Sequence, residues 1–294
     1  MADDLAAPAQ ATHAGTPDPG APHPKTTYMT LAIRQDGPVD WVTFNRPEAL
    51  NALNPQMIDD LLDYFASLYM NNAVRVVVLQ GAGRAYCAGL DLKDTSNRSE
   101  TSVLQTGPAA GLISQRRISE IVMRMRKCPQ PIISLVHGPA CGGGFALALA
   151  SDIRIAGDSA RMNAAFIRIG LSACDIGVSY FLPRLVGVSV ASELMLTGRF
   201  ITADRALATG LVSEVVADGD LAEAAAPYVH DMVTTAPLGL RLTKECLNMT
   251  IDAGSLEAAI ALEDRNQILC SGTEDFAEGV RAFVEKRPPR YQDR

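Results

Sequence analysis

Two apolar β-strand candidates that each run straight into a glycine-bearing loop constrain the fold of this chain most. The run VRVVVLQ (74–80) is rich in valine and is followed directly by GAGRAYCAGLDLKD (81–94). The second run, PIISLVH (131–137), leads into HGPACGGGFALALASDIRIA (137–156). Continuous apolar runs of this length are typical of strands covered on both faces. We therefore expect strand–loop–helix units, in which small residues let the loop backbone approach a ligand closely.

The glycine cluster of the second loop indicates where a ligand would be held. Gly142, Gly143 and Gly144 lead into the apolar helical run FALALA. A helix that begins at glycines exposes unpaired N–H groups and the positive end of its dipole. Together with an N–H from the first loop, such an end can hold the oxygen of a polarised carbonyl, as in an oxyanion hole. The same glycines also suit a tight turn, and neither loop matches GxGxxG or GxxxxGK[ST].

The remaining pattern places strands early and helices late. Alternation in TLAIRQ and DWVTFN predicts two strands joined at Gly37-Pro38, and Asn54-Pro55 predicts the start of a helix. The apolar face of that helix is expected to comprise Met57, Ile58, Leu61, Leu62, Phe65, Leu68 and Tyr69. A further helix is expected to end near Lys127, and amphipathic segments follow near 190–198, 220–233, 240–250, 255–270 and 273–285. This order predicts an α/β core that carries a helical C-terminal part.

Composition excludes several classes of function. The net charge of −7 and the pI near 5.2 give no electrostatic footprint for nucleic acid or an anionic membrane. No apolar run reaches the roughly 18 residues needed to span a bilayer. Six cysteines without CxxC spacing indicate reduced, mostly buried thiols in the cytoplasm, and no His/Cys/Asp cluster has metal-ligand spacing. Residues 1–27, rich in Ala and Pro, are predicted to be a disordered tail and lack the features of a signal peptide.

Several motifs in combination resemble the crotonase (enoyl-CoA hydratase/isomerase) superfamily. They are FNRPEALNAL (44–53), the two glycine loops, LPRLVGVSVASELMLTGRFITADRALATGLVSEVV (182–216) and FVEKR (283–287). The resemblance implies a crotonase-like spiral of ββα units over 28–215 that holds the acyl-CoA site. It implies a helical C-terminal trimerisation region over 216–294, and homotrimers or dimers of trimers. The ligand would be an acyl-CoA thioester, so that coenzyme A is part of the substrate and no separate cofactor is expected.

The same resemblance assigns binding residues. The two oxyanion donors would be the backbone amides of Leu90 and Gly143. The acyl-CoA-contacting segment would be Leu90, Asp91, Leu92 and Lys93, although Asp91 also suits a structural role that fixes the loop. Phe283 and Lys286 match positions that touch the adenine and 3′-phosphate of coenzyme A. Lys286 is equally suited to being a solvated cation at a helix end.

The catalytic acids of the family's hydratases are missing here. Their two glutamates fall on Ala146 and Phe166, and neither side chain can carry a proton. Asp175 lies in an otherwise apolar loop, which resembles that of the dienoyl-CoA isomerases with one extra residue. A carboxylate in such surroundings has a raised pKa that suits a general acid/base. The alternative role for Asp175 is that of a helix N-cap.

Two classes of function therefore remain open. The first is an enzyme of the hydratase/isomerase type in which Asp175 moves a proton beside the Leu90 and Gly143 amides. The second is a non-catalytic acyl-CoA-binding protein that has kept the pocket without the glutamates. A serine hydrolase is excluded by the lack of GxSxG. Cys87 and Cys141, which flank the loops without an adjacent base, are interpreted as small core residues.

Overall fold

The computed structural model describes residues 27–94 and 107–294, so the predicted disordered tail lies outside the described residues except for Thr27. The main sheet has the strand order β1-β2-β3-β4-β6-β9, in which β1 is antiparallel to β2 and the other neighbours are parallel. Its strands are Leu31–Asp36 (β1), Val39–Phe44 (β2), Val76–Gly81 (β3), Ile132–Val136 (β4), Ile153–Gly157 (β6) and Glu214–Val216 (β9). A smaller sheet contains Pro139–Cys141 (β5), Arg161–Asn163 (β7) and Ile201–Thr202 (β8).

The four strands that the sequence predicts are confirmed as β1, β2, β3 and β4. The short strands beyond them were not anticipated, because runs of two to five residues carry little periodicity. The helices are Pro55–Leu68 (α1), Gly107–Lys127 (α2), Gly143–Ala150 (α3), Val178–Thr197 (α4), Ala203–Ala208 (α5), Leu221–Val233 (α6), Pro237–Thr250 (α7), Leu256–Ser271 (α8) and Glu274–Glu285 (α9). Short 3₁₀ segments in the described part of the chain cover Pro47–Ala49 (η1), Ala165–Ile169 (η3) and Asp218–Asp220 (η4).

Helix α1 begins as its sequence predicts. The Asn54 side chain accepts a hydrogen bond from the Met57 amide at 2.9 Å, and Pro55 occupies the first helical position. The predicted apolar face is mostly buried, but Tyr69, which follows the last helical residue, is 62% exposed. Helix α4 begins earlier than the predicted segment near 190, and its φ/ψ angles are non-helical at Gly187.

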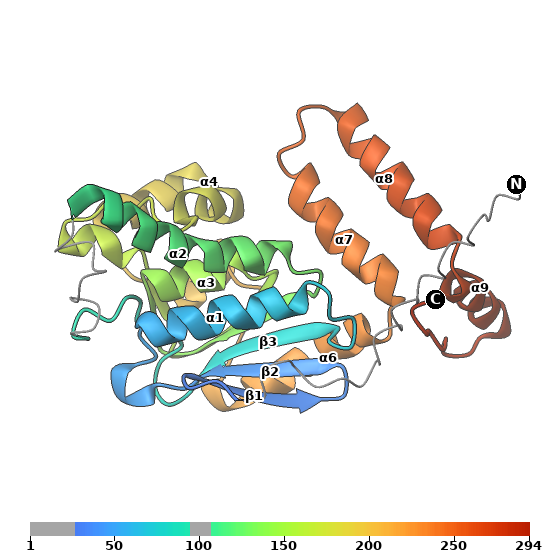
Figure 1. The fold of residues 1–294 in the computed structure, drawn as a ribbon, viewed down its shortest axis with the longest axis horizontal. Helices are drawn as coiled ribbons and strands as arrows, with labels where there is room; N and C mark the ends of the chain where they lie inside the picture. Colours follow the sequence, from blue (N-terminus) through green and yellow to red (C-terminus); the bar gives the residue numbers. More distant parts are fainter. Residues whose placement is uncertain (1–26, 95–106) are drawn as a thin grey trace, which may run out of the picture.

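The sheet lies between helices on both faces (Figure 1). Helices α1, α2 and α3 cover one face and share the larger apolar core, whereas α6 packs on the other face with a smaller apolar cluster. Because both faces are covered, β3 and β4 are almost entirely apolar and buried. The carboxyl ends of these two strands then lead into the two glycine loops.

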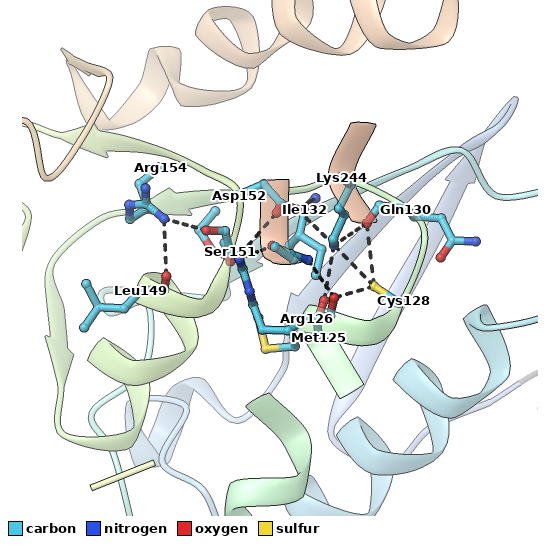
Figure 2. A network of polar contacts seen from close by, with 12 residues as sticks. Met125, Arg126, Cys128, Gln130, Ile132, Leu149, Ser151, Asp152, Arg154 and Lys244 are labelled. Atoms are coloured by element: carbon cyan, nitrogen blue, oxygen red, sulfur yellow. Dashed lines mark hydrogen bonds and ion pairs between the residues drawn. The ribbon is translucent and has the colours of Figure 1, made fainter. Parts of the chain in front are cut away.

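Helices α7, α8 and α9 extend away from this body (Figure 1). Helix α7 contacts the α/β body through Lys244, whose side chain is only 5% exposed. The Lys244 ammonium pairs with the Asp152 carboxylate at 2.9 Å and donates to the carbonyl oxygens of Gln130 and Met125 at 2.7 and 3.2 Å (Figure 2). A buried cation with this many partners stabilises one docking position of the helix.

Candidate active site

The two glycine loops run side by side and are joined by main-chain hydrogen bonds. The Cys87 amide donates to the Pro139 carbonyl at 3.2 Å, and the Cys141 amide donates back to the Cys87 carbonyl at 3.0 Å. Gly89 lies at the end of this pairing with φ +91°, a conformation that favours glycine. A Cβ on Gly89 would lie 2.6 Å from the Cys141 carbonyl oxygen and 3.3 Å from the Gly143 amide nitrogen. The loops therefore meet at the two residues that the sequence singled out, Leu90 and Gly143.

Both of these residues have an amide that the fold leaves without an internal partner. Leu90 follows Gly89, whose carbonyl accepts from the Leu53 amide at 2.7 Å, and precedes Asp91, whose amide donates to the Leu53 carbonyl at 3.0 Å. Gly143 is the first residue of α3, where helix geometry supplies no acceptor. Within the described residues, neither the Leu90 amide nor the Gly143 amide donates to a protein acceptor. Such amides are available to an oxygen that enters from outside.

Asp91 fixes the loop that carries Leu90. Its carboxylate pairs with the Arg46 guanidinium at 2.9 Å and accepts hydrogen bonds from the Lys93 and Asp94 amides, each at 3.1 Å. Asp91 is 8% exposed, whereas Leu92 and Lys93 are exposed. The geometry therefore gives Asp91 the structural role, and leaves Leu92 and Lys93 accessible to a ligand.

Buried apolar side chains occupy both positions at which the family's hydratases carry glutamates. Ala146 of α3 is completely buried, and Phe166 of η3 is 8% exposed. The Phe166 ring lies 3.4 Å from the position that a Cβ on Gly142 would occupy. No proton-carrying group is therefore present at either place.

Asp175 lies in the loop before α4, and its N-cap interpretation is wrong. Helix α4 begins after Gly177, which has φ +90° and no side-chain cap. The Asp175 Oδ1 atom instead accepts hydrogen bonds from the Ile176 amide at 2.8 Å and from the Gln115 side-chain amide of α2. The Ile176 Cδ1 atom lies 3.7 Å from the position that a Cβ on Gly143 would occupy. The residue next to Asp175 therefore packs against the residue that carries the second free amide.

Burial is the main influence on the Asp175 carboxyl group. Loss of hydration raises its pKa above the usual value for aspartate, and the hydrogen bonds from Ile176 and Gln115 partly offset that rise. A half-buried carboxyl group with a raised pKa can exchange a proton nearer to neutral pH than an ordinary aspartate. The sequence predicted this property from the apolar loop but gave no indication of Gln115.

The two residues at the end of α9 that are predicted to contact coenzyme A lie far from the glycine loops of the same chain. Phe283 is 86% exposed, and Lys286 caps the end of α9 with φ 54°. Helix α9 lies at the opposite end of the molecule from α2, α3 and α4 (Figure 1).

Other reactive groups near the loops have environments that suppress their chemistry. Burial raises the pKa of the Cys87 thiol to about 12 and that of Cys141 to about 11, so neither forms a thiolate readily. The expectation that the thiols are mostly buried is wrong: Cys87 and Cys128 are buried, but Cys174 is exposed and the other three are half-buried.

Among the described residues, no group of three His, Cys, Asp or Glu side chains could hold a metal ion. None of the described helices is long and apolar enough to span a membrane.

Together, the two-sheet α/β core and the paired glycine loops define a crotonase fold. A family model described as enoyl-CoA hydratase/isomerase matches residues 34–294. The chain therefore belongs to the enoyl-CoA hydratase/isomerase family, whose members act on acyl-CoA thioesters, and it is an enzyme of that family.

Individual relatives agree with this assignment. A Mycobacterium tuberculosis protein named "probable enoyl-CoA hydratase" is 38% identical over 271 residues, which cover 92% of this chain and 95% of that protein. The 1,2-epoxyphenylacetyl-CoA isomerase of Escherichia coli is 36% identical and covers 85% of this chain and 93% of its own. A solved structure of an enoyl-CoA hydratase from Bacillus anthracis has a TM-score of 0.83 at 30% identity, and covers 90% of this chain and all of that one.

Proposed function

We propose that this enzyme stabilises the enolate of an acyl-CoA thioester between the Leu90 and Gly143 amides, with Asp175 as its acid/base. The observation that carries the proposal is the pair of amides without internal acceptors at the meeting point of the two loops. A thioester oxygen that gains negative charge there is stabilised by two fixed donors. Removing one such donor from an enzyme typically lowers the rate about 10²–10³-fold.

Proton transfer within the substrate fits the site better than hydration. The Asp175 carboxylate would take a proton from a carbon next to the thioester carbonyl, which leaves an enolate. The same proton, returned to a different carbon, would move the double bond, so that atoms and charge balance without a second acid. Hydration needs one group to activate water and another to protonate carbon, and Ala146 and Phe166 supply neither. A water molecule held by Asp175 makes hydration the second reaction to test.

A non-catalytic acyl-CoA-binding protein remains the second candidate function. The observation that favours it is that buried apolar residues, Ala146 and Phe166, stand where the hydratases of this family carry glutamates. It predicts acyl-CoA binding by calorimetry without exchange of protons at the α-carbon. Detectable α-deuteration of a bound acyl-CoA in D₂O excludes this alternative.

The first experiment compares crotonyl-CoA, a 3-enoyl-CoA and a dienoyl-CoA as substrates. We expect turnover of the 3-enoyl or dienoyl substrate to exceed hydration of crotonyl-CoA. Asp175→Asn should abolish proton exchange, whereas Asp158→Asn, at an exposed turn, should keep it. Undiminished exchange in Asp175→Asn removes Asp175 from the mechanism.

We also propose that the chain assembles as a homotrimer or a dimer of trimers through its C-terminal helices. Large apolar side chains are exposed on this region: Leu247, Met249, Ile251, Leu256, Ile260, Ile268, Leu269, Phe276, Val280, Phe283 and Val284. Exposed apolar surface of this extent is typical of an interface. A second copy of the chain would then supply Phe283 and Lys286 to the part of the site that binds coenzyme A. Sedimentation analysis tests the oligomeric state.

Two further properties follow from the same proposal. The reaction needs no cofactor beyond the coenzyme A of its substrate, so dialysis against EDTA should leave turnover unchanged. We place the enzyme in the cytoplasm, which the six free cysteines support. Fluorescence microscopy of a tagged chain in its own cell tests the location.

A further inference from the structure

Gln115 lies on α2, and its side-chain amide reaches the Asp175 carboxylate in the loop before α4. Asp175 Oδ1 therefore receives two hydrogen bonds, one from Gln115 Nε2 and one from the Ile176 amide. Within the described part of the chain, the other oxygen of this carboxylate, Oδ2, accepts none. It is also not among the buried polar atoms that lack a partner, so it is not sealed from solvent. The two oxygens of one side chain thus have different environments.

We infer that Gln115 is a positioning residue, which holds Asp175 Oδ1 in place and leaves Oδ2 as the one oxygen that exchanges a proton with the substrate. This inference rests on the proposed role of Asp175 as acid/base. Gln115 does not itself contact the reacting atoms in this assignment. It acts only through the orientation and the charge of the Asp175 carboxylate.

A fixed orientation needs the second donor. The terminal torsion of an aspartate side chain is broad and close to two-fold, so one hydrogen bond leaves the carboxylate free to turn. The Ile176 amide belongs to the adjacent residue and moves with the loop, whereas Gln115 comes from a helix packed on the core. Ile176 also has φ 34°, which is unusual for a β-branched residue. The loop therefore holds a strained conformation, and the hydrogen bond from α2 helps to keep it there.

Among the described residues on the elements that flank Asp175, two polar or charged side chains are already paired elsewhere. On α2, Arg117 pairs with Asp59 of α1, and at the start of α4 the Tyr180 hydroxyl donates to Asp252. Burial raises the pKa of Asp175, and the Ile176 and Gln115 hydrogen bonds lower it. Loss of the Gln115 donor should therefore raise this pKa further, because the charged form loses a hydrogen bond.

The experiment measures kcat/KM for α-proton exchange as a function of pH in wild type, Gln115→Leu and Gln115→Glu. Asp175 must be ionised to take a proton, so activity falls on the acidic side as its carboxylate is protonated. We expect Gln115→Leu to move this acidic limb to higher pH and to lower kcat/KM about 10-fold. A decrease of this size is expected when one hydrogen bond to a charged group is lost. Gln115→Glu keeps the shape of the side chain but places a second carboxyl group beside Asp175, and should move the limb further.

Arg116→Ala is the matched control, because Arg116 is the exposed neighbour of Gln115 on α2. Its pH profile should superimpose on that of wild type. If Gln115→Leu fails to fold, Gln115→Glu is the variant that tests the role of Gln115, since it preserves the side-chain volume. Profiles of Gln115→Leu and Gln115→Glu that superimpose on wild type overturn the positioning role while Asp175→Asn remains inactive. Normal exchange in Asp175→Asn overturns the proposed function itself, whatever the Gln115 variants show.

Discussion

Gly144 and Cys87 are in such close contact that a Cβ on Gly144 would lie 2.0 Å from the Cys87 carbonyl oxygen. The same carbonyl accepts a hydrogen bond from the Cys141 amide at 3.0 Å. Gly144 is helical and has no unusual φ, so the requirement for glycine is the close packing of the first loop on α3. This contact holds the loop that carries Leu90 against the helix that begins at Gly143.

Gly144→Ala should therefore separate the two loops. We expect a loss of stability of about 1–3 kcal/mol from overpacking, and a fall of about 10²-fold or more in proton exchange. Urea denaturation and the exchange assay measure the two effects. Gly239→Ala is the matched control, because Gly239 is also near the start of a helix and has nothing within 4 Å of its Cβ position. Equal activity of the two variants contradicts the packing argument.

The ion pair between Arg46 and Asp91 should contribute to both stability and binding. The two side chains are 17% and 10% exposed, so Asp91→Asn leaves a largely buried cation without its counter-charge. We expect a loss of about 2–4 kcal/mol in the free energy of unfolding and a raised KM for acyl-CoA, because the Leu90 loop loosens. The exposed pair of Arg34 and Asp36 provides the comparison, since Asp36→Asn should cost less than about 1 kcal/mol. Similar losses in the two variants are the result that would contradict this prediction.

Much of the local structure was predictable from the sequence because its causes are local. The Asn54 side chain caps α1 through an amide three residues away, and the valine run of β3 shows that both faces of that strand are covered. The meeting of the two loops was also predictable, since the loops follow adjacent parallel strands. The assignment of Leu90 and Gly143 as oxyanion donors came from the family resemblance and stays a prediction. Parallel neighbours bring their carboxyl ends to one edge of the sheet.

The parts that sequence reasoning missed depend on contacts between distant segments. Gln115 is 60 residues from Asp175 and lies in a helix whose amphipathic pattern gives no hint of that partner. Lys244 also appears as an ordinary helical lysine, yet it is buried against a carbonyl 119 residues away. The N-cap alternative for Asp175 was wrong because Gly177, with its positive φ, is the residue that precedes α4, and the helix begins at Val178. Such pairings follow from the packing of whole helices, which no local pattern specifies.

Asp175 should destabilise the fold at neutral pH. Its folded-state pKa is raised by burial, so the native state holds the proton more tightly than the unfolded chain. The protonated Asp175 side chain therefore contributes to stability. This contribution is present in full below the ordinary aspartate pKa, and it is lost as the pH rises through the folded-state pKa of Asp175. Asp175→Asn, which carries no charge, should have a higher Tm than wild type at pH 7, and the difference should shrink in acid. A lower Tm for the variant at pH 7, measured by calorimetry, contradicts this sign.

Lys244 should hold the C-terminal helices in position. Lys244→Met removes the cation that the Asp152 carboxylate and the Gln130 and Met125 carbonyls surround (Figure 2). Asp152 keeps its ion pair with Arg126 at 3.5 Å and its hydrogen bond from the Ile132 amide, but the Gln130 and Met125 carbonyls lose their donor. The loss of the buried pair should therefore cost about 3 kcal/mol, the lower end of the range for such pairs. Since α7 connects α8 and α9 to the core, the variant should also assemble less readily. On dilution, its sedimentation coefficient should therefore fall at a higher protein concentration than that of wild type. Lys127→Met, at an exposed position at the end of α2, should change neither property, and equal behaviour of the two variants would show that the buried lysine does not hold α7.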